Sequence, residues 1–150
     1  MDLQKIRGVY ERIVIDAASP VPTYVENQSA VDFSKLKEYC KVFVNFGLIQ
    51  DTVIGAPAQW NVRGSLVCEI YSRKQIGPGR GIQIASPIIE ALTALNGLIP
   101  PPEQEIIARV GPVTGPRQSQ LQDRPHHFTR FSMPFLARSQ PVLAPEPPTP

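Results

Sequence analysis

Apolar residues recur every three or four positions near the start of the chain, which is the spacing of one helix face. This segment runs from Leu3 to Ala17, and Asp2 stands where an N-cap is expected. Two prolines, Pro20 and Pro22, follow directly, and proline removes a backbone donor. The pattern therefore predicts an amino-terminal helix that ends before Pro20.

The same spacing returns between Ile82 and Leu95. Ser86 and Pro87 form a good N-cap and first-turn pair, so the regular helix begins either at Ile82 or at Ser86. Asn96-Gly97 is expected to close it with a left-handed C-cap.

Alternating apolar and polar residues predict strands elsewhere. A bend is expected near Gly64, because that strand is long, and Pro134 predicts that the last strand lies at an edge or bulges. Three aromatic residues, Trp60, Phe131 and Phe135, are assigned to the core. The segments are Thr23–Asn27 (a short extended piece), Tyr39–Phe46, Trp60–Tyr71, Glu105–Val113 and Phe128–Arg138.

This order of elements predicts an α+β domain with a mostly antiparallel sheet of four to five strands and two packed helices. The domain covers residues 1–138. Residues 139–150 contain five prolines and one charge, and they are expected to form a disordered or extended arm. Two connections, Gly47–Pro57 and Gly115–Arg124, are expected to protrude as exposed arms.

The composition is that of an ordinary globular protein, with 42% apolar residues among 150. A net charge of +2 is too weak to indicate a nucleic-acid binder by itself. The amino terminus is charged throughout, so neither a signal peptide nor a membrane span is expected there or in any other segment. Cys40 and Cys68 lack CxxC spacing, which favours two reduced thiols in a cytoplasmic protein over a disulfide.

The glycine-rich stretch Gly77–Gly81 looks at first like a phosphate-binding loop. A Walker loop needs a lysine and a hydroxyl residue that are missing here, and the glycine spacing does not fit a dinucleotide loop. Pro78 also removes an amide that would face a phosphate. We expect a tight turn that carries an exposed Arg80, and no cofactor.

No residues form a convincing catalytic or metal-binding set. His126 and His127 are adjacent, so in a strand they point to opposite faces and rarely share a metal. Cys68 falls on a face predicted to be buried, where a thiol is inert. Glu69 and Glu90 have no spacing that marks an acid–base pair. The protein is therefore not expected to be an enzyme.

Basic residues are the remaining candidates for function. They surround the glycine-rich turn and recur in the last third of the chain. Such residues form either an ordinary solvated face or a surface that docks an acidic protein ring or lies near DNA phosphates. The candidate interface residues are Arg63, Arg73, Lys74, Arg80, Arg117 and Arg124.

The succession of segments resembles the tail terminators of long-tailed bacteriophages, also called tail-completion or minor tail proteins. The resemblance rests on order and pattern over residues 1–138. Its segments are VPTYVEN, YCKVFVNFG, WNVRGSLVCEIYSRK, the glycine-rich turn with its helix, IIARVGPVTGP and FTRFSMPFLAR. It implies a ring-forming α+β subunit that closes as a hexamer on the head-proximal end of the tail tube and stops tube polymerisation. No catalytic residues are implied.

The resemblance also implies partners. These are further copies of the chain, the tail tube protein, a neck or head-completion protein, and the sheath protein where the tail contracts. Genomic DNA would pass through the ring lumen, and the protein would reside in the virion after assembly in the host cytoplasm. The prolines at 100–102, the proline-rich arm and the polar stretch Gln28–Lys37 depart from the family pattern.

Two alternatives remain open at this stage. One is a head-completion or connector protein of the phage neck. The other, from a different class, is a small basic nucleic-acid-binding module, which salt-dependent binding to duplex DNA would reveal.

Overall fold

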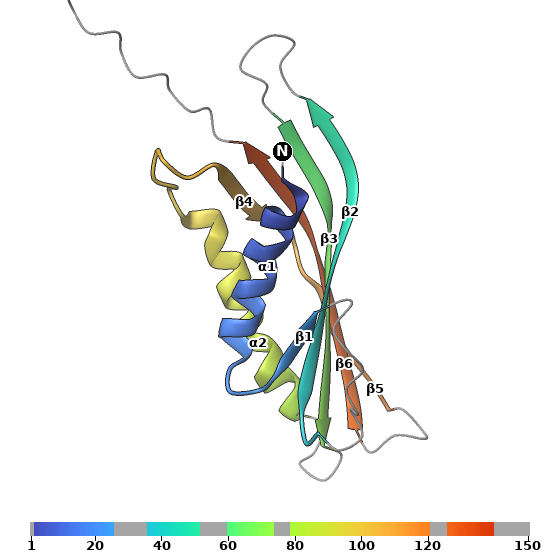
Figure 1. Ribbon diagram of the computed structural model, residues 1–150. Coiled ribbons are helices and arrows are strands. Elements are labelled where there is room, and N and C mark those ends of the chain that lie inside the picture. The colour runs from blue at the N-terminus through green and yellow to red at the C-terminus, as the bar shows by residue number, and fades with distance from the viewer. Residues whose placement is uncertain (1, 26–35, 52–59, 74–78, 121–125, 140–150) are drawn as a thin grey trace, which may run out of the picture.

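A computed structural model describes residues 2–25, 36–51, 60–73, 79–120 and 126–139. Two helices pack against each other on one face of a six-stranded sheet (Figure 1). The predicted α+β class is confirmed, although the sheet has one strand more than the four to five expected.

The sheet is antiparallel apart from one short parallel pair. Its order is β1-β2-β3-β6-β4, and β5 also pairs with β6. Among the described strands, β1 and β2 alone run parallel. The strands are β1 (Thr23–Val25), β2 (Tyr39–Asp51), β3 (Trp60–Arg73), β4 (Ile106–Val110), β5 (Thr114–Gln120) and β6 (His126–Ser139).

The first helix, α1 (Leu3–Ala18), forms as the sequence predicts. The Asp2 carboxylate accepts hydrogen bonds from the backbone N–H groups of Gln4 and Lys5, which satisfies two donors at the helix start. Its buried residues repeat at intervals of four and face the sheet, and they are Ile6, Tyr10, Val14 and Ala18. This stripe is what holds the helix on the core.

The second helix, α2 (Gly79–Ala94), begins earlier than either predicted start. Ser86 and Pro87 are exposed positions inside the helix, and Ser86 Oγ donates to the carbonyl of Ile82 rather than capping a terminus. The early start follows from Gly81, because a Cβ there would lie 2.1 Å from Thr129 Oγ1. The missing side chain lets the first turn of α2 pack directly on β6.

The predicted left-handed C-cap at Asn96-Gly97 is wrong. These residues belong to a short 3₁₀ turn, η3 (Leu95–Gly97), and Gly115 is the one described glycine with a positive φ. Instead, the Asn96 side chain donates to the carbonyl of Val110 and accepts from its N–H. The helix end is thus fixed by bonds to β4.

The prediction that Pro134 marks an edge strand or a bulge is also wrong, because β6 has neighbours on both sides and its register with β3 runs through Pro134 without a shift. On one side it pairs with β3 from His126 to Arg138. On the other side β4 pairs from Phe135 onward and β5 pairs up to Ser132, so Pro134 lies where the neighbour changes. Its carbonyl accepts from Gly111 N–H at 2.7 Å, so the missing N–H faces this junction and breaks no regular ladder.

The expected arm Gly47–Pro57 is partly wrong, since β2 continues through Gly47 to Asp51. The pairing with β3 shifts between Phe46 and Ile49, next to Gly64, where a bend was expected. Residues 52–57 lie outside the described chain. In the arm Gly115–Arg124, the part up to Gln120 is strand β5, and residues 121–124 lie outside it.

The core lies between the helices and the sheet. Phe131 and Phe135 are buried there as predicted, whereas Trp60 packs against the core but is only partly buried. Ser139, assigned to the arm, is the last residue of β6. The rest of the arm and residues 28–35 are not among the described residues.

Candidate interaction surfaces

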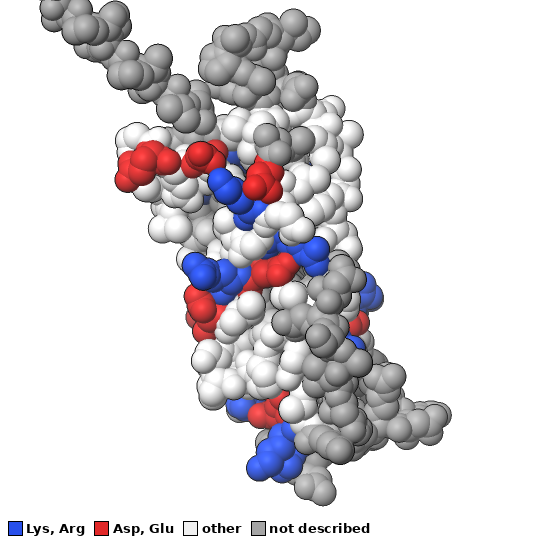
Figure 2. Space-filling view, in the orientation of Figure 1, with Lys and Arg blue, Asp and Glu red and all other residues white. Residues whose placement is uncertain are grey.

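The six predicted interface residues do not come together in one patch. Arg73 and Arg80 lie at the sheet end where β3 finishes and α2 begins, while Arg63 is exposed about ten residues back along β3. Arg117 is exposed on β5. Lys74 and Arg124 lie outside the described residues. Basic and acidic groups are also interspersed on the side of the molecule seen in Figure 2.

Arg80 is not the free, exposed cation that the turn was expected to carry. Its guanidinium makes two hydrogen bonds to the Glu38 carboxylate, and its side chain is 32% exposed. Glu38 holds the positive charge in place and raises the Arg80 pKa further. Because α2 starts at Gly79, Arg80 points from the first turn of the helix toward Glu38 at the start of β2.

The outer sheet face, which the helices leave uncovered, carries a row of charges across four strands. The register aligns Lys41 of β2 with Glu69 of β3, Glu69 with Arg130 of β6, and Arg130 with Arg117 of β5. A shallow pocket of about 150 Å³ is lined by Arg117 and Arg130 together with Thr114, Phe131 and Ser132. Two cations therefore stand directly opposite each other, which is unfavourable without a counter-charge.

The same outer face holds an aromatic cluster at the end near Arg73. Tyr39 and Tyr71 stack with ring centroids 4.5 Å apart, and His126 meets Tyr39 edge-on at 5.4 Å. The His126 ring also hydrogen-bonds the carbonyl of Leu36 at 2.7 Å. His126 is buried and has a structural role, while neighbouring His127 points to the other face, as adjacent strand residues must.

Both cysteines are buried on the helix-facing side of the sheet, and neither forms a disulfide. Burial raises the pKa of the Cys40 thiol to about 12 and that of Cys68 still higher. A thiol held in its protonated form is a poor nucleophile. Among the described residues, no group of three or more His, Cys, Asp or Glu side chains could hold a metal ion.

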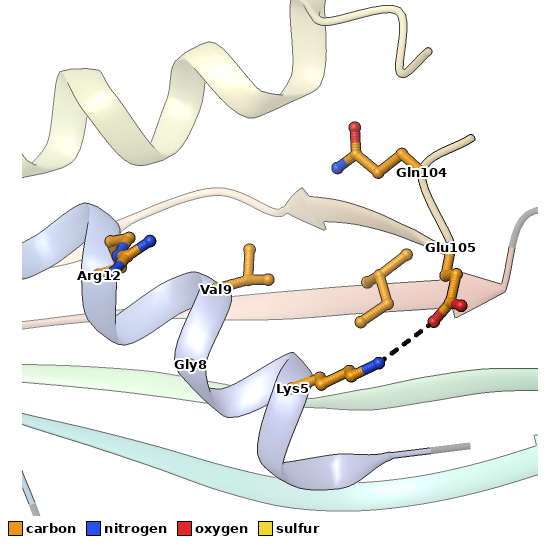
Figure 3. Close-up of a pocket in the computed structure, with 7 residues that line it drawn as sticks. Lys5, Gly8, Val9, Arg12, Gln104 and Glu105 are labelled. Atoms are coloured by element: carbon orange, nitrogen blue, oxygen red, sulfur yellow. Dashed lines mark ion pairs between the residues drawn. The ribbon is translucent and has the colours of Figure 1, made fainter. Parts of the chain in front are cut away.

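A groove of about 520 Å³ runs between α1 and the start of β4 (Figure 3). Gly8, Val9 and Ile106 supply its apolar surface. Lys5 reaches across to Glu105 at 3.5 Å and marks one end, and Arg12 lies toward the other. Gln104 completes the lining. The sequence offered no signal for this site, since its residues are separated by almost a hundred positions.

The exposed apolar residues were also missed, because β2 was expected to end at Phe46. Leu48 and Ile49 are 53% and 41% exposed in the outer half of β2. Leu98 and Ile99 are 58% and 93% exposed after η3. The register places Ile49 toward the end of the sheet where β4 begins, and Leu98 and Ile99 lie in the connection that leads into β4. The two apolar residues Leu48 and Ile49, which directly follow Phe46 and Gly47, were the available sequence signal.

Comparison with known proteins bears on the fold of the chain and not on its function. No protein-family model matches the chain, and no curated protein matches it. One solved structure, of a protein described without a function, is similar at a TM-score of 0.57 with 20% sequence identity. The match covers 97% of this chain and 99% of that one. Among the described residues, neither helix is both long and apolar enough to cross a membrane.

Proposed function

We propose that the protein is a ring-forming structural subunit that caps the head-proximal end of a phage tail tube. The observation that carries the proposal is the pair of different open edges on opposite sides of the sheet. On one side β1 pairs only with Cys40–Val42, so the edge of β2 that faces away from β3 has no neighbouring strand from Phe43 to Asp51 among the described residues. On the other side, β4 and β5 form the edge.

Two unlike edges support head-to-tail association. When one copy joins its β2 edge to the β4 or β5 edge of the next, the contact is heterologous, and such contacts generate closed rings when the rotation closes. Leu48 and Ile49 strengthen this argument, because an exposed apolar strand edge is an aggregation hazard unless a partner covers it. The number of six copies comes from the family resemblance.

The two ends of the subunit also differ in chemistry. One end has the exposed apolar residues Leu98 and Ile99, and the other has Arg73 and the Arg80–Glu38 pair. A terminator needs two unlike surfaces, because it binds the growing tube on one side and must offer no tube-like surface on the other. Its mechanism is interface competition, with no chemical step. The tube protein, neck protein and sheath protein are its proposed partners.

The ring is tested by comparing Ile49→Lys with Ile15→Lys. Both isoleucines are 41% exposed, so the two changes place the same charge at equally exposed sites, one on the open edge and one on α1. Analytical ultracentrifugation should show that Ile49→Lys reduces a ring of 16.6 kDa subunits to monomers while Ile15→Lys leaves it assembled. A wild-type protein that stays monomeric at high concentration contradicts the ring.

The role in the tail is tested by deleting the gene from the parent phage and measuring tails by electron microscopy. Overlong tubes detached from filled heads support termination, and Ile15→Lys but not Ile49→Lys should restore normal tails. Tails of normal length beside unjoined heads would instead favour a head-completion or connector protein. Intact, infectious particles would exclude both structural roles.

A second candidate function is binding of nucleic acid through the outer sheet face. It is favoured by the opposed Arg117 and Arg130 and by exposed Arg63 and Arg138 on the same face. Binding to phosphates would weaken steeply as salt rises. Duplex DNA binding that is salt-dependent and lost in Arg130→Gln would support this function, and its absence would leave the structural role.

A further inference from the structure

The groove between α1 and β4 lies where the described chain ends. Ser139, the last residue of β6, pairs with Ile106, which also lines the groove. The groove's Lys5–Glu105 end is therefore next to the point where residues 140–150 leave the sheet. From there the groove extends along α1 toward Arg12 (Figure 3).

The segment that follows is long enough to cross this groove. Its eleven residues, 140–150, would span about 34 Å as a polyproline II helix at about 3.1 Å per residue. The seven steps from Lys5 to Arg12 rise about 10 Å along a helix at about 1.5 Å per residue. No change in β6 is needed for the segment to reach Arg12.

The chemistry of the segment matches that of the groove. Val142 and Leu143 are its large apolar side chains, and the groove offers Val9, Ile106 and the bare backbone at Gly8. Glu146 is the one charged residue of the segment. Arg12 is exposed and has no ion-pair partner among the described residues, so Glu146 complements it. Five prolines in residues 139–150 reduce the entropy lost when such a segment docks.

We propose that this groove binds residues 140–150 of the same molecule, with Val142 and Leu143 over Val9 and Ile106 and with Glu146 beside Arg12. The proposal does not depend on the tail-capping function. In this arrangement the proline-rich segment covers the apolar surface of the groove between α1 and β4.

A spin label on the segment tests this docking in the full chain. Ala144→Cys provides one accessible thiol, and the buried Cys40 and Cys68 thiols should stay unlabelled. In nuclear magnetic resonance spectra, the amide signals of Val9 and Ile106 should lose intensity through paramagnetic broadening. Broadening spread evenly over the surface would overturn the proposal.

Matched variants in the labelled chain identify the groove as the cause. A Cβ added at either Gly8 or Gly79 has open space around it, so both positions can carry a side chain without a clash at Cβ. Gly8→Leu fills the groove and should abolish the local loss of signal, whereas Gly79→Leu on α2 should preserve it. Persistence of the broadening in Gly8→Leu would contradict docking.

Charge reversal tests the contact between Arg12 and Glu146. Arg12→Glu should reduce the broadening, and adding Glu146→Arg should restore it. A mixture of spin-labelled copies and separate isotope-enriched copies tells which molecule supplies the segment. Broadening that appears only in this mixture would overturn the proposal, because a second copy would then occupy the groove.

Discussion

Arg80 donates from Nε to one carboxylate oxygen of Glu38 at 2.8 Å and from Nη2 to the other at 3.0 Å. The pair joins the first turn of α2 to the residue just before β2. Glu38 is 16% exposed, so the contact is partly shielded from water. Arg80 therefore acts within the subunit, and this explains why it does not behave as a free cation beside a glycine-rich turn.

Removing this pair should cost stability rather than assembly. Arg80→Ala is expected to lower the free energy of unfolding by about 1 kcal/mol, because the pair is bidentate but still partly exposed. Arg80→Lys should recover only part of the loss, since lysine cannot make the two parallel bonds. Urea denaturation of Arg80→Ala, Glu38→Ala and the double variant measures the coupling. Strictly additive effects would show that the pair contributes nothing.

Two glycines should respond to alanine in opposite directions. A Cβ at Gly64 would lie 2.1 Å from the Asn45 carbonyl oxygen and 2.6 Å from the Phe135 ring. Gly64→Ala should therefore destabilise the protein by about 1–3 kcal/mol through overpacking. Gly8 lies inside α1 with open space around its Cβ position, so Gly8→Ala should stabilise by about 0.5–1 kcal/mol. Thermal unfolding should show a lower midpoint temperature for Gly64→Ala and a higher one for Gly8→Ala. Equal changes in the two midpoints would refute the close packing at Gly64.

Much of this fold could be predicted because burial leaves a periodic trace in the sequence. Ile6, Tyr10 and Val14 repeat at the spacing of a helix, and the odd-numbered residues Phe131 to Phe135 alternate as a strand requires. Strand β5 left no such trace. Its residues are polar or small, and backbone pairing with β6 holds it in place, which side-chain patterns do not record.

The errors arose where tertiary contacts override local preference. The helix α2 starts at Gly79, where Gly81 packs against Thr129, and so Pro87 lies inside it rather than in its first turn. Pro134 is tolerated in a central strand because the neighbouring strand changes there. The candidate surfaces were harder to predict from the sequence than the fold, since the groove and the charge row each bring together residues from distant segments. Only the register and the packing of α1 bring those residues together.

Alkaline pH should destabilise the protein through its buried thiols. Burial raises the Cys40 pKa to about 12 and raises the Cys68 pKa further, so the folded state keeps protons that the unfolded chain releases. The unfolded chain then binds fewer protons, and the free energy of unfolding must fall as pH rises. The fall should begin above the ordinary thiol pKa of about 8.5, at up to about 1.4 kcal/mol per pH unit for each thiol.

Urea denaturation between pH 8 and pH 11 (roughly the range over which free thiols ionise) measures this slope. A Cys40→Ala, Cys68→Ala variant should show a shallower slope, even though it is less stable at every pH. Tyr10, whose pKa burial also raises, should account for part of the slope that remains. An unchanged slope in the double variant would rule out the thiols as its source.

A substitution at Arg117, which lies opposite Arg130, should change the stability of the subunit and its binding to partners in opposite directions. The two arginines occupy opposed register positions on β5 and β6, where like charges are unfavourable by about 0.2–1 kcal/mol. Arg117→Glu should therefore stabilise the isolated subunit by about that amount, with the gain shrinking as salt screens the pair. Arg117→Gln is the control that removes the repulsion without adding attraction.

The Arg117→Glu variant also tests whether the two arginines bind a partner. If they bind an acidic protein or phosphates, Arg117→Glu should weaken that binding, measured with the proposed partners and with duplex DNA. A gain in stability with no loss of any binding would mean that this face is simply solvated.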